Sequence, residues 1–242
     1  MEYQTTLPLF YRKPVPLNSV THATMSIAPS PGGFAFAAAA HSVMLTAVEF
    51  GEACRYFPIL FAVSGAGPAV PVALMGLQSG ENLFVGPAGE WQAGYIPAYI
   101  RRYPFISTEG DDAAGIVCID EAFDGLNREG GELLFEESAP GPYLQKILEF
   151  LKDFLAQVQA TESFCLQLQE LELLKPMSAT IQLADHRQFN LTDFMVVDEQ
   201  KLQAIDGAVL EKLFKSGCLA LMYAHLISLK SLQGLLDKKS TR

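Results

Sequence analysis

PVALMGLQSGENLFVGPAGEWQAGYIPAYIRRYPF, residues 71–105, is the stretch that does most to decide the fold. It holds the only Trp of the chain, three Tyr, an Arg pair, five Gly and four Pro. Gly and Pro at this density predict several tight turns, which would hold large amphipathic side chains in a fixed arrangement at the surface. The pattern is typical of a recognition site, and it is also how a compact β-rich core turns its corners.

Short elements are expected within this stretch because Gly and Pro interrupt it so often. Pro71 to Gly76 and Asn82 to Val85 are predicted strands, and Gly86 to Gly89 is a predicted hairpin turn. Pro97 should open a short helical turn that ends before Pro104, since Pro favours the first position of a helix and disfavours helix in the residue before it.

The large side chains of the stretch form a candidate binding site for a peptide or an anion. A guanidinium fork binds carboxylate or phosphate through two hydrogen bonds, and aromatic rings supply apolar contact area. Neighbouring residues of a helical turn point about 100° apart, so the two Arg should contact different partners. The alternative is that both Arg pair internally with the acidic stretch beginning at Glu109. The candidate residues are Trp91, Tyr95, Tyr99, Arg101, Arg102 and Tyr103.

The sequence pattern of the N-terminal half predicts short strands joined by tight connections. Ser42 to Thr46 should be a strand that leads into a short helix over Ala47 to Arg55. Phe57 to Ser64 and Ala69 to Gly76 are apolar strands separated by a Gly/Pro turn, and Ile116 to Ile119 adds another strand. Such connections suit a mostly antiparallel sheet.

The apolar period changes near Pro140. A helix is expected with an apolar face from Leu144 to Val158, followed by a second helix from Glu162 to Leu174 that ends before Pro176. Thr180 to Leu183 and Phe194 to Val197 predict a hairpin.

The last part of the chain should be helical. Asp198 and Asp206 are placed to open short helices, and Gly217 precedes a long helix from Cys218 to Asp237. We therefore predict an α+β fold with a β-rich N-terminal half and a helix-rich C-terminal half. Two lobes, residues 1–139 and 140–242, and one continuous α+β domain are both compatible with this pattern.

Several motifs resemble one protein family. GLQSGENLFV, GEW and YIPAYIRRYPF, with VVDEQKLQAI and LFKSGCLALMYAHLISLKSLQGLL near the C-terminus, closely resemble the signature of the SapC family of bacterial proteins. The family is named for an association with surface-layer systems. The resemblance covers nearly the whole chain, implies an accessory role and carries over no catalytic residues.

The charge of the chain argues against nucleic acid as a partner. A net charge of −10 and a pI near 4.8 leave no basic face to neutralise phosphates. From Glu109 to Glu137 the sequence has ten carboxylates and one basic residue, Arg128. This stretch is either a solvated acidic connection or a docking surface for a basic partner.

The sequence also bears on compartment and membrane. Its four cysteines, Cys54, Cys118, Cys165 and Cys218, form no CxxC pair, so reduced thiols are expected. The N-terminus lacks a signal-peptide pattern, and no uninterrupted apolar run reaches the roughly 18 residues of a membrane span. We therefore expect a cytoplasmic protein without a membrane span.

Motifs for known chemistry are missing from the sequence. Ser64 in VSGAG does not fit the GxSxG nucleophile motif, and neither HExxH nor a P-loop occurs. We predict no catalytic residue, no metal site and no cofactor. His225, beside the apolar face of the last helix, is either a buried hydrogen-bonded histidine or a secondary functional residue.

Two functions follow from these features. The first is a non-catalytic accessory protein that binds a protein or peptide and serves a surface-layer, export or modification system. The second is an enzyme or small-ligand binder with a site between the two halves, using Arg101, Arg102, Tyr103 or His225.

Overall fold

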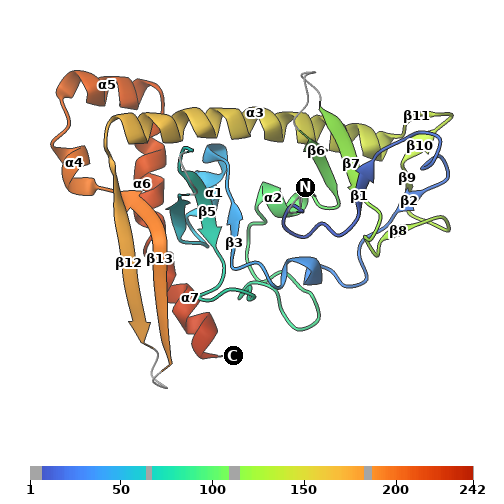
Figure 1. The fold of residues 1–242 in the computed structure, drawn as a ribbon, viewed down its shortest axis with the longest axis horizontal. Helices are drawn as coiled ribbons and strands as arrows, with labels where there is room; N and C mark the ends of the chain where they lie inside the picture. Colours follow the sequence, from blue (N-terminus) through green and yellow to red (C-terminus); the bar gives the residue numbers. More distant parts are fainter. Residues whose placement is uncertain (1–6, 64–66, 109–114, 183–186, 242) are drawn as a thin grey trace, which may run out of the picture. The chain divides into compact units, whose positions relative to one another are not determined.

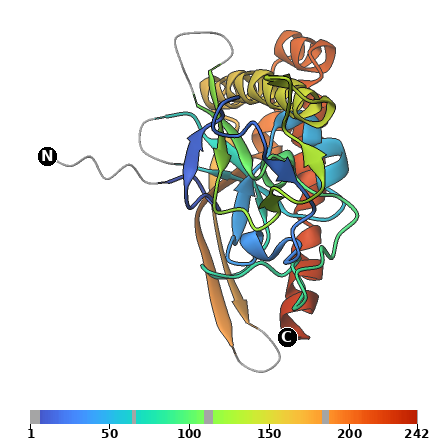
Figure 2. The same cartoon turned by 90° about the vertical axis from the view of Figure 1, so that its right-hand side faces the viewer.

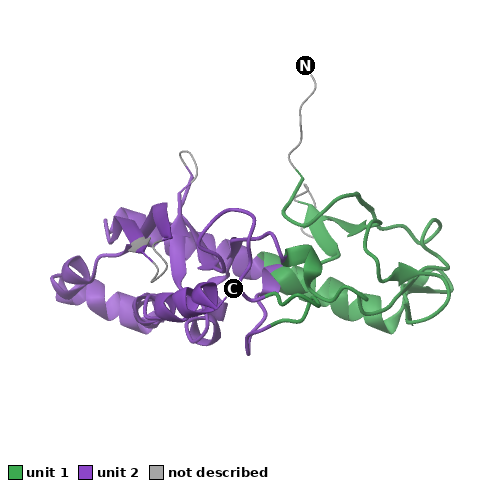
Figure 3. Ribbon diagram, turned by 90° about the horizontal axis from the view of Figure 1, so that it is seen from below, with its two compact units in different colours: residues 1–37, 85–91, 100–155 green, residues 38–84, 92–99, 156–242 purple. Residues whose placement is uncertain are grey.

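The computed structural model describes residues 7–63, 67–108, 115–182 and 187–241 (Figure 1). The fold is α+β, as predicted, with antiparallel strands mostly in the N-terminal half and most helices in the C-terminal half. The chain divides into two compact units (Figure 3). Unit 1 comprises residues 1–37, 85–91 and 100–155, and unit 2 comprises residues 38–84, 92–99 and 156–242. Each unit draws on separate stretches of sequence, and the division into lobes at residue 140 stays a prediction.

Unit 1 is built from small antiparallel sheets and the first part of helix α3 (Pro142–Glu170). Three sheets occur among its described residues, in the strand orders β1-β7-β6, β8-β2-β9 and β10-β11. The single-turn helix η1 is Ala35–Ala37. The strands are β1 (Pro14–Pro16), β2 (Ser26–Ile27), β6 (Phe105–Thr108), β7 (Ile116–Asp120), β8 (Leu126–Asn127), β9 (Glu132–Leu133), β10 (Phe135–Glu136) and β11 (Ala139–Pro140).

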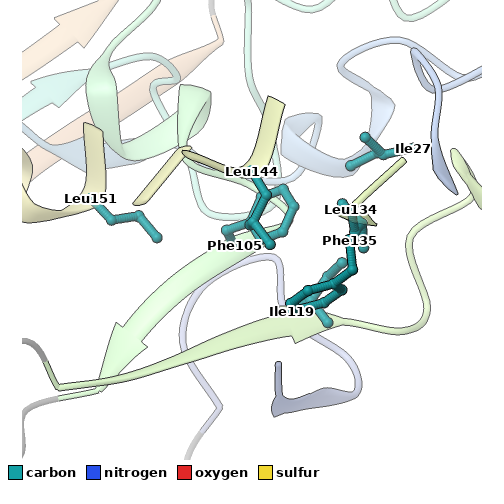
Figure 4. Close-up of a cluster of buried hydrophobic side chains, with 7 residues drawn as sticks. All are labelled: Ile27, Phe105, Ile119, Leu134, Phe135, Leu144 and Leu151. Carbon is teal, nitrogen blue, oxygen red and sulfur yellow. The ribbon is translucent and has the colours of Figure 1, made fainter. Parts of the chain in front are cut away.

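The core of unit 1 lies between α3 and these strands (Figure 4). Leu144 and Leu151 come from α3, seven residues apart and therefore on one face of the helix. They join Phe105 of β6 and Ile119 of β7, which are paired across the sheet. Burying such side chains contributes about 2 kcal/mol each, which is what holds short strands of this kind together. Ile27, Leu134 and Phe135 complete the cluster.

Unit 2 contains a five-stranded antiparallel sheet with the order β12-β13-β4-β5-β3. The predicted apolar strands are confirmed as β4 (Ile59–Ala62) and β5 (Val70–Leu74), which lie inside the sheet. Their buried apolar runs fit that place, because both faces of an inner strand are covered. β3 (Ser42–Met44) leads into η2 (Ala47–Glu49) and α1 (Phe50–Ala53), as expected.

A hairpin occurs where one was predicted, but its strands are longer and its register differs: Phe194 pairs with Met177 and Thr180 with Asn190, and Leu183 lies outside the described residues. β12 (Leu174–Gln182) pairs with β13 (Gln188–Val197), and among the described residues β13 pairs with β4 through Phe194 and Met195 alone. The hairpin therefore extends past the rest of its sheet (Figure 2).

Helices follow the hairpin. Asp198 and Asp206 open α4 (Glu199–Gln203) and α5 (Gly207–Lys215), and their side chains accept hydrogen bonds from backbone N–H groups of the first turns. Gly217, with a left-handed φ of 79°, separates α5 from α6 (Cys218–Ser228). α7 (Ser231–Ser240) ends the helical part of the chain.

Three predicted elements are wrong in detail. One helix, α3, replaces the two expected between residues 140 and 174, because no Gly or Pro interrupts it after its first residue, Pro142. A turn at residues 229–230 divides the last helix into α6 and α7. Residues 82–85 are not a strand: Asn82 Oδ1 accepts from the Phe84 N–H, which bends the backbone, and Val85 makes one bridge to Trp91.

By length and composition, one helical segment among the described residues, Cys218–Ser240, is apolar enough to cross a membrane. A single segment of this kind is weak evidence for a span, because core helices of folded proteins have the same composition; here 22% of its most apolar window is buried. Met222, His225 and Ser228 of this segment are buried within unit 2. Ser228 Oγ accepts a hydrogen bond from the Ile59 N–H of β4 at 2.9 Å.

Candidate functional site

A buried carboxylate in unit 2 holds the first tyrosine of YIPAYIRRYPF, residues 95–105. Glu49 is 5% exposed. Its Oε1 accepts from the Tyr95 hydroxyl at 2.8 Å and from the Ala98 N–H, at the start of α2 (Ala98–Arg101), at 2.7 Å. Its Oε2 accepts from the backbone N–H and the hydroxyl of Thr46 at 2.8 and 2.9 Å. These four donors replace the water that a carboxylate loses on burial, so Tyr95 serves the fold of unit 2.

A second buried carboxylate, in unit 1, holds the third tyrosine. Asp120, at the end of β7, has no exposed surface. Its Oδ1 accepts from the backbone N–H groups of Lys13 and Ala122 at 2.8 and 3.0 Å. Its Oδ2 accepts from the Arg12 N–H at 2.9 Å and from the Tyr103 hydroxyl at 3.3 Å. Burial, followed by the charge of Asp120, raises the pKa of Tyr103 to about 12, so this hydroxyl stays protonated and donates.

Aromatic rings surround Tyr103 in unit 1. Phe36 stacks on Tyr103 with ring centroids 4.3 Å apart and planes at 27°. Phe123, Tyr11 and Phe10 meet the same ring edge-on, at 5.5, 5.3 and 6.3 Å. Phe10 has a φ of 83°, a strained conformation for a bulky residue that persists where packing fixes it. Tyr103 is thus held at its polar end by Asp120 and on its ring by this cluster.

A pocket of about 190 Å³ opens beside Tyr103 and lies wholly in unit 1. Three half-buried rings, Phe36, Tyr103 and Phe123, line it. We call it the aromatic pocket. Its wall consists of Arg12, Ser30, Gly32, Ala35, Phe36, Tyr103, Ala122, Phe123 and Asp124.

The aromatic pocket carries one positive and one negative side chain. Arg12 and Asp124 are both exposed, and both act on the Tyr103 hydroxyl: Arg12 lowers its pKa and Asp124 raises it. No hydrogen bond or ion pair joins the Arg12 guanidinium or the Asp124 carboxylate to another described residue. The two groups are therefore available to a ligand.

Trp91 belongs to a pair of glycine loops in unit 1. Its ring contacts Phe34 with centroids 5.5 Å apart. The Phe34 N–H donates to the Gly89 carbonyl at 2.8 Å. Gly33 and Gly89 both have left-handed backbones, and a Cβ at Gly89 would lie 2.0 Å from the Gly32 carbonyl oxygen. The turn predicted at residues 86–89 is confirmed, and its glycines allow the two loops to touch backbone to backbone.

The Arg pair contacts aromatic rings of α3 within unit 1. The Arg101 side chain is exposed and lies over Phe150 at 5.2 Å. Arg102 is 9% exposed and lies over Phe154 at 5.2 Å and over Tyr11 at 6.0 Å. The two guanidinium groups thus meet different rings, and burial leaves little of Arg102 for a partner. Glu109, proposed above as the start of an acidic stretch that pairs with them, lies outside the described residues.

His225 is a buried, hydrogen-bonded residue of unit 2. It has no exposed surface, and its Nε2 accepts from the Val197 N–H of β13 at 3.1 Å. Its ring lies 5.0 Å from that of Phe61. Burial lowers the pKa of His225 to about 4, so the ring is neutral near pH 7.

The predicted site residues do not form one site in the structure. Tyr103 lines the aromatic pocket, whereas Trp91, Arg101 and Arg102 lie elsewhere in unit 1. Tyr95, Tyr99, which is half-buried on α2, and His225 belong to unit 2. Sequence reasoning missed the other aromatic and charged residues of the pocket, because they come from separate segments: Arg12, Phe36, Phe123 and Asp124.

The groups around the aromatic pocket are suited to binding. Aromatic rings offer apolar contact, and two charged side chains at the surface offer orientation. Within the ranges that the structure describes, no three His, Cys, Asp or Glu side chains gather as a metal site.

These features define an α+β protein of antiparallel sheets with a surface pocket of aromatic and charged residues. The SapC family profile matches residues 17–235, nearly the whole chain, and the chain belongs to the SapC family. No curated protein and no solved structure matches it.

Proposed function

We propose that this SapC family protein is a cytoplasmic accessory protein that binds a protein or peptide without catalysis and serves a surface-layer, export or modification system. The observation that carries the proposal is the aromatic pocket of unit 1. Binding energy in protein complexes concentrates in a few anchors, commonly aromatic or Arg residues that fill a well-packed pocket.

The contacts around the pocket fix its wall before any partner binds, which supports the proposal. Four donors fix the Asp120 carboxylate, and this carboxylate orients Tyr103. Phe36 and Phe123 pack on the same ring. A wall held in this way loses little conformational entropy when a partner arrives, which favours affinity.

Selection from a displayed library of 12-residue peptides tests the proposal. The wild-type protein is compared with Ala122→Phe, which fills the aromatic pocket from an exposed position of its wall. Ala139→Phe adds the same ring at an exposed residue of β11, outside the pocket wall, and is the matched control. Circular dichroism establishes that all three proteins are folded.

We expect peptides that bind the wild type and Ala139→Phe and lose at least tenfold in affinity for Ala122→Phe, equivalent to about 1.4 kcal/mol. Failure to enrich any peptide, or equal affinity for all three proteins, would contradict the proposal.

A further inference from the structure

The aromatic pocket has the size of a single large side chain. Its volume is about 190 Å³, a little more than the roughly 150 Å³ of a protein cavity that holds one benzene ring. Three rings meet such an occupant, and aromatic side chains gain from edge and offset contacts with other rings. The chemistry of the wall therefore favours a large aromatic side chain as the anchor.

The two charged side chains of the wall also restrict the charge of the ligand. Arg12 would attract a carboxylate and repel a cation, while Asp124 would do the reverse. Since neither side chain is engaged by another described residue, a ligand of one charge satisfies one group and opposes the other. A ligand with both charges, one toward each group, satisfies both.

The positions of these charges are set by the fold. The backbone N–H of Arg12 donates a hydrogen bond to Asp120, so the Cα from which the Arg12 side chain extends is fixed near Tyr103. The Asp124 carboxylate lies over Gly32, where a Cβ would come within 3.4 Å of its Oδ2. The Asp124 carboxylate thus lies beside the loop of Gly32, on the wall of the pocket.

We infer that the aromatic pocket selects a peptide segment in which an aromatic residue lies between one acidic and one basic residue. The inference rests on the proposed function and names its ligand. The acidic side chain contacts Arg12, the basic side chain contacts Asp124, and the ring packs against the sides of Phe36, Tyr103 and Phe123 that line the pocket.

Four synthetic peptides with blocked ends test the inference by isothermal titration calorimetry. Their cores are Glu-Trp-Lys, Gln-Trp-Lys, Glu-Trp-Gln and Gln-Trp-Gln, each flanked by two Gly on both sides. Each is titrated into the wild type, Arg12→Gln and Asp124→Asn. Both replaced side chains are exposed, and the Arg12 backbone bond to Asp120 does not depend on its side chain, so folding should be retained.

We expect each charge to raise affinity for the wild type by about fivefold, as for partly exposed ion pairs. Arg12→Gln should abolish the gain from Glu and keep the gain from Lys, and Asp124→Asn should do the opposite. High salt should reduce the affinity gained from the Glu and from the Lys of the peptide.

The outcomes separate this inference from the proposed function. If the neutral Gln-Trp-Gln peptide binds as tightly as the charged ones, or if none of the four binds, the inference is overturned. Library peptides that depend on the pocket would still support the proposed function. If the library also yields nothing, both fail.

Discussion

Asp120 is the residue on which the geometry of the aromatic pocket depends. Asp120→Ala leaves three backbone N–H groups and the Tyr103 hydroxyl, all of them partly buried, without their acceptor. We expect unit 1 to lose about 3 kcal/mol in the free energy of unfolding. Trp91 is the only Trp of the chain and lies in unit 1, so its fluorescence during urea denaturation reports this loss.

Tyr103→Phe is the matched comparison for this prediction, because it removes one of the four donors and keeps the ring. Its cost should be about 1 kcal/mol. Equal stability of Asp120→Ala and wild type would show that the carboxylate is not an anchor of unit 1.

His225 should make stability depend on pH. Its pKa is about 4 in the folded protein and about 6.5 for an imidazole in the unfolded chain. Between these values the unfolded chain binds a proton that the folded chain does not, so its contribution is complete above about pH 6.5 and is lost as the pH falls toward 4. In total the loss amounts to about 3 kcal/mol.

His225→Gln is the control for this pH effect, since an amide does not titrate and its oxygen can accept from the Val197 N–H. We expect the stability advantage of the wild type over this variant to shrink by about 2 kcal/mol from about pH 7 to pH 5. Urea midpoints measured by circular dichroism at several pH values give the answer. A constant difference would mean that His225 is not held neutral by burial.

The contact between the two glycine loops should not tolerate side chains. Gly89→Ala forces a left-handed backbone on Ala and brings its Cβ 2.0 Å from the Gly32 carbonyl oxygen. We expect a cost of at least about 2 kcal/mol, read from the Trp91 unfolding transition. Gly130→Ala, where a Cβ meets no atom within 4 Å, is the control and should change stability little. A similar effect of both variants would count against this contact.

The elements with strong local signals could be predicted from sequence. Buried strands β4 and β5 follow from apolar runs between Gly and Pro, and helix starts α4 and α5 follow from capping Asp198 and Asp206. The predictions were wrong where the local sequence signal for the start or end of an element is weak. Residues 159–161 lack a helix breaker, so α3 continues through them, and β6 (Phe105–Thr108) was missed because it directly follows Pro104.

The candidate site could be predicted only in part. Tyr103 stood out because it lies in YIPAYIRRYPF, and the resemblance to the SapC family was visible in the same motif. Arg12, Phe36 and Asp124 meet through tertiary packing, which no spacing in the sequence reveals. Glu49 stands in the capping-box pattern Thr46-x-x-Glu49, but that pattern does not reveal its burial or its bonds to Tyr95 and Ala98.

The apolar segment Cys218–Ser240 either crosses a membrane or belongs to the fold of unit 2. His225 and Ser228 are buried and bind backbone N–H groups of β13 and β4. Insertion would break these bonds and place two polar side chains in hydrocarbon, at a cost of several kcal/mol. The sequence composition alone does not contain this information, because it shows apolarity without the partners.

We therefore expect the chain to stay out of membranes. When the protein is made in bacteria, membranes are floated on a density gradient and washed with alkaline carbonate, which releases proteins that do not span the bilayer. Flotation also separates inserted protein from aggregates, which sink. The wild-type chain should remain in the dense, non-membrane fractions or be released by carbonate.

His225→Leu/Ser228→Leu removes both polar partners and raises the hydropathy of the segment, so any membrane-bound fraction should increase in this variant. If the wild type instead floats with membranes after carbonate, the segment spans the bilayer and the cytoplasmic assignment fails.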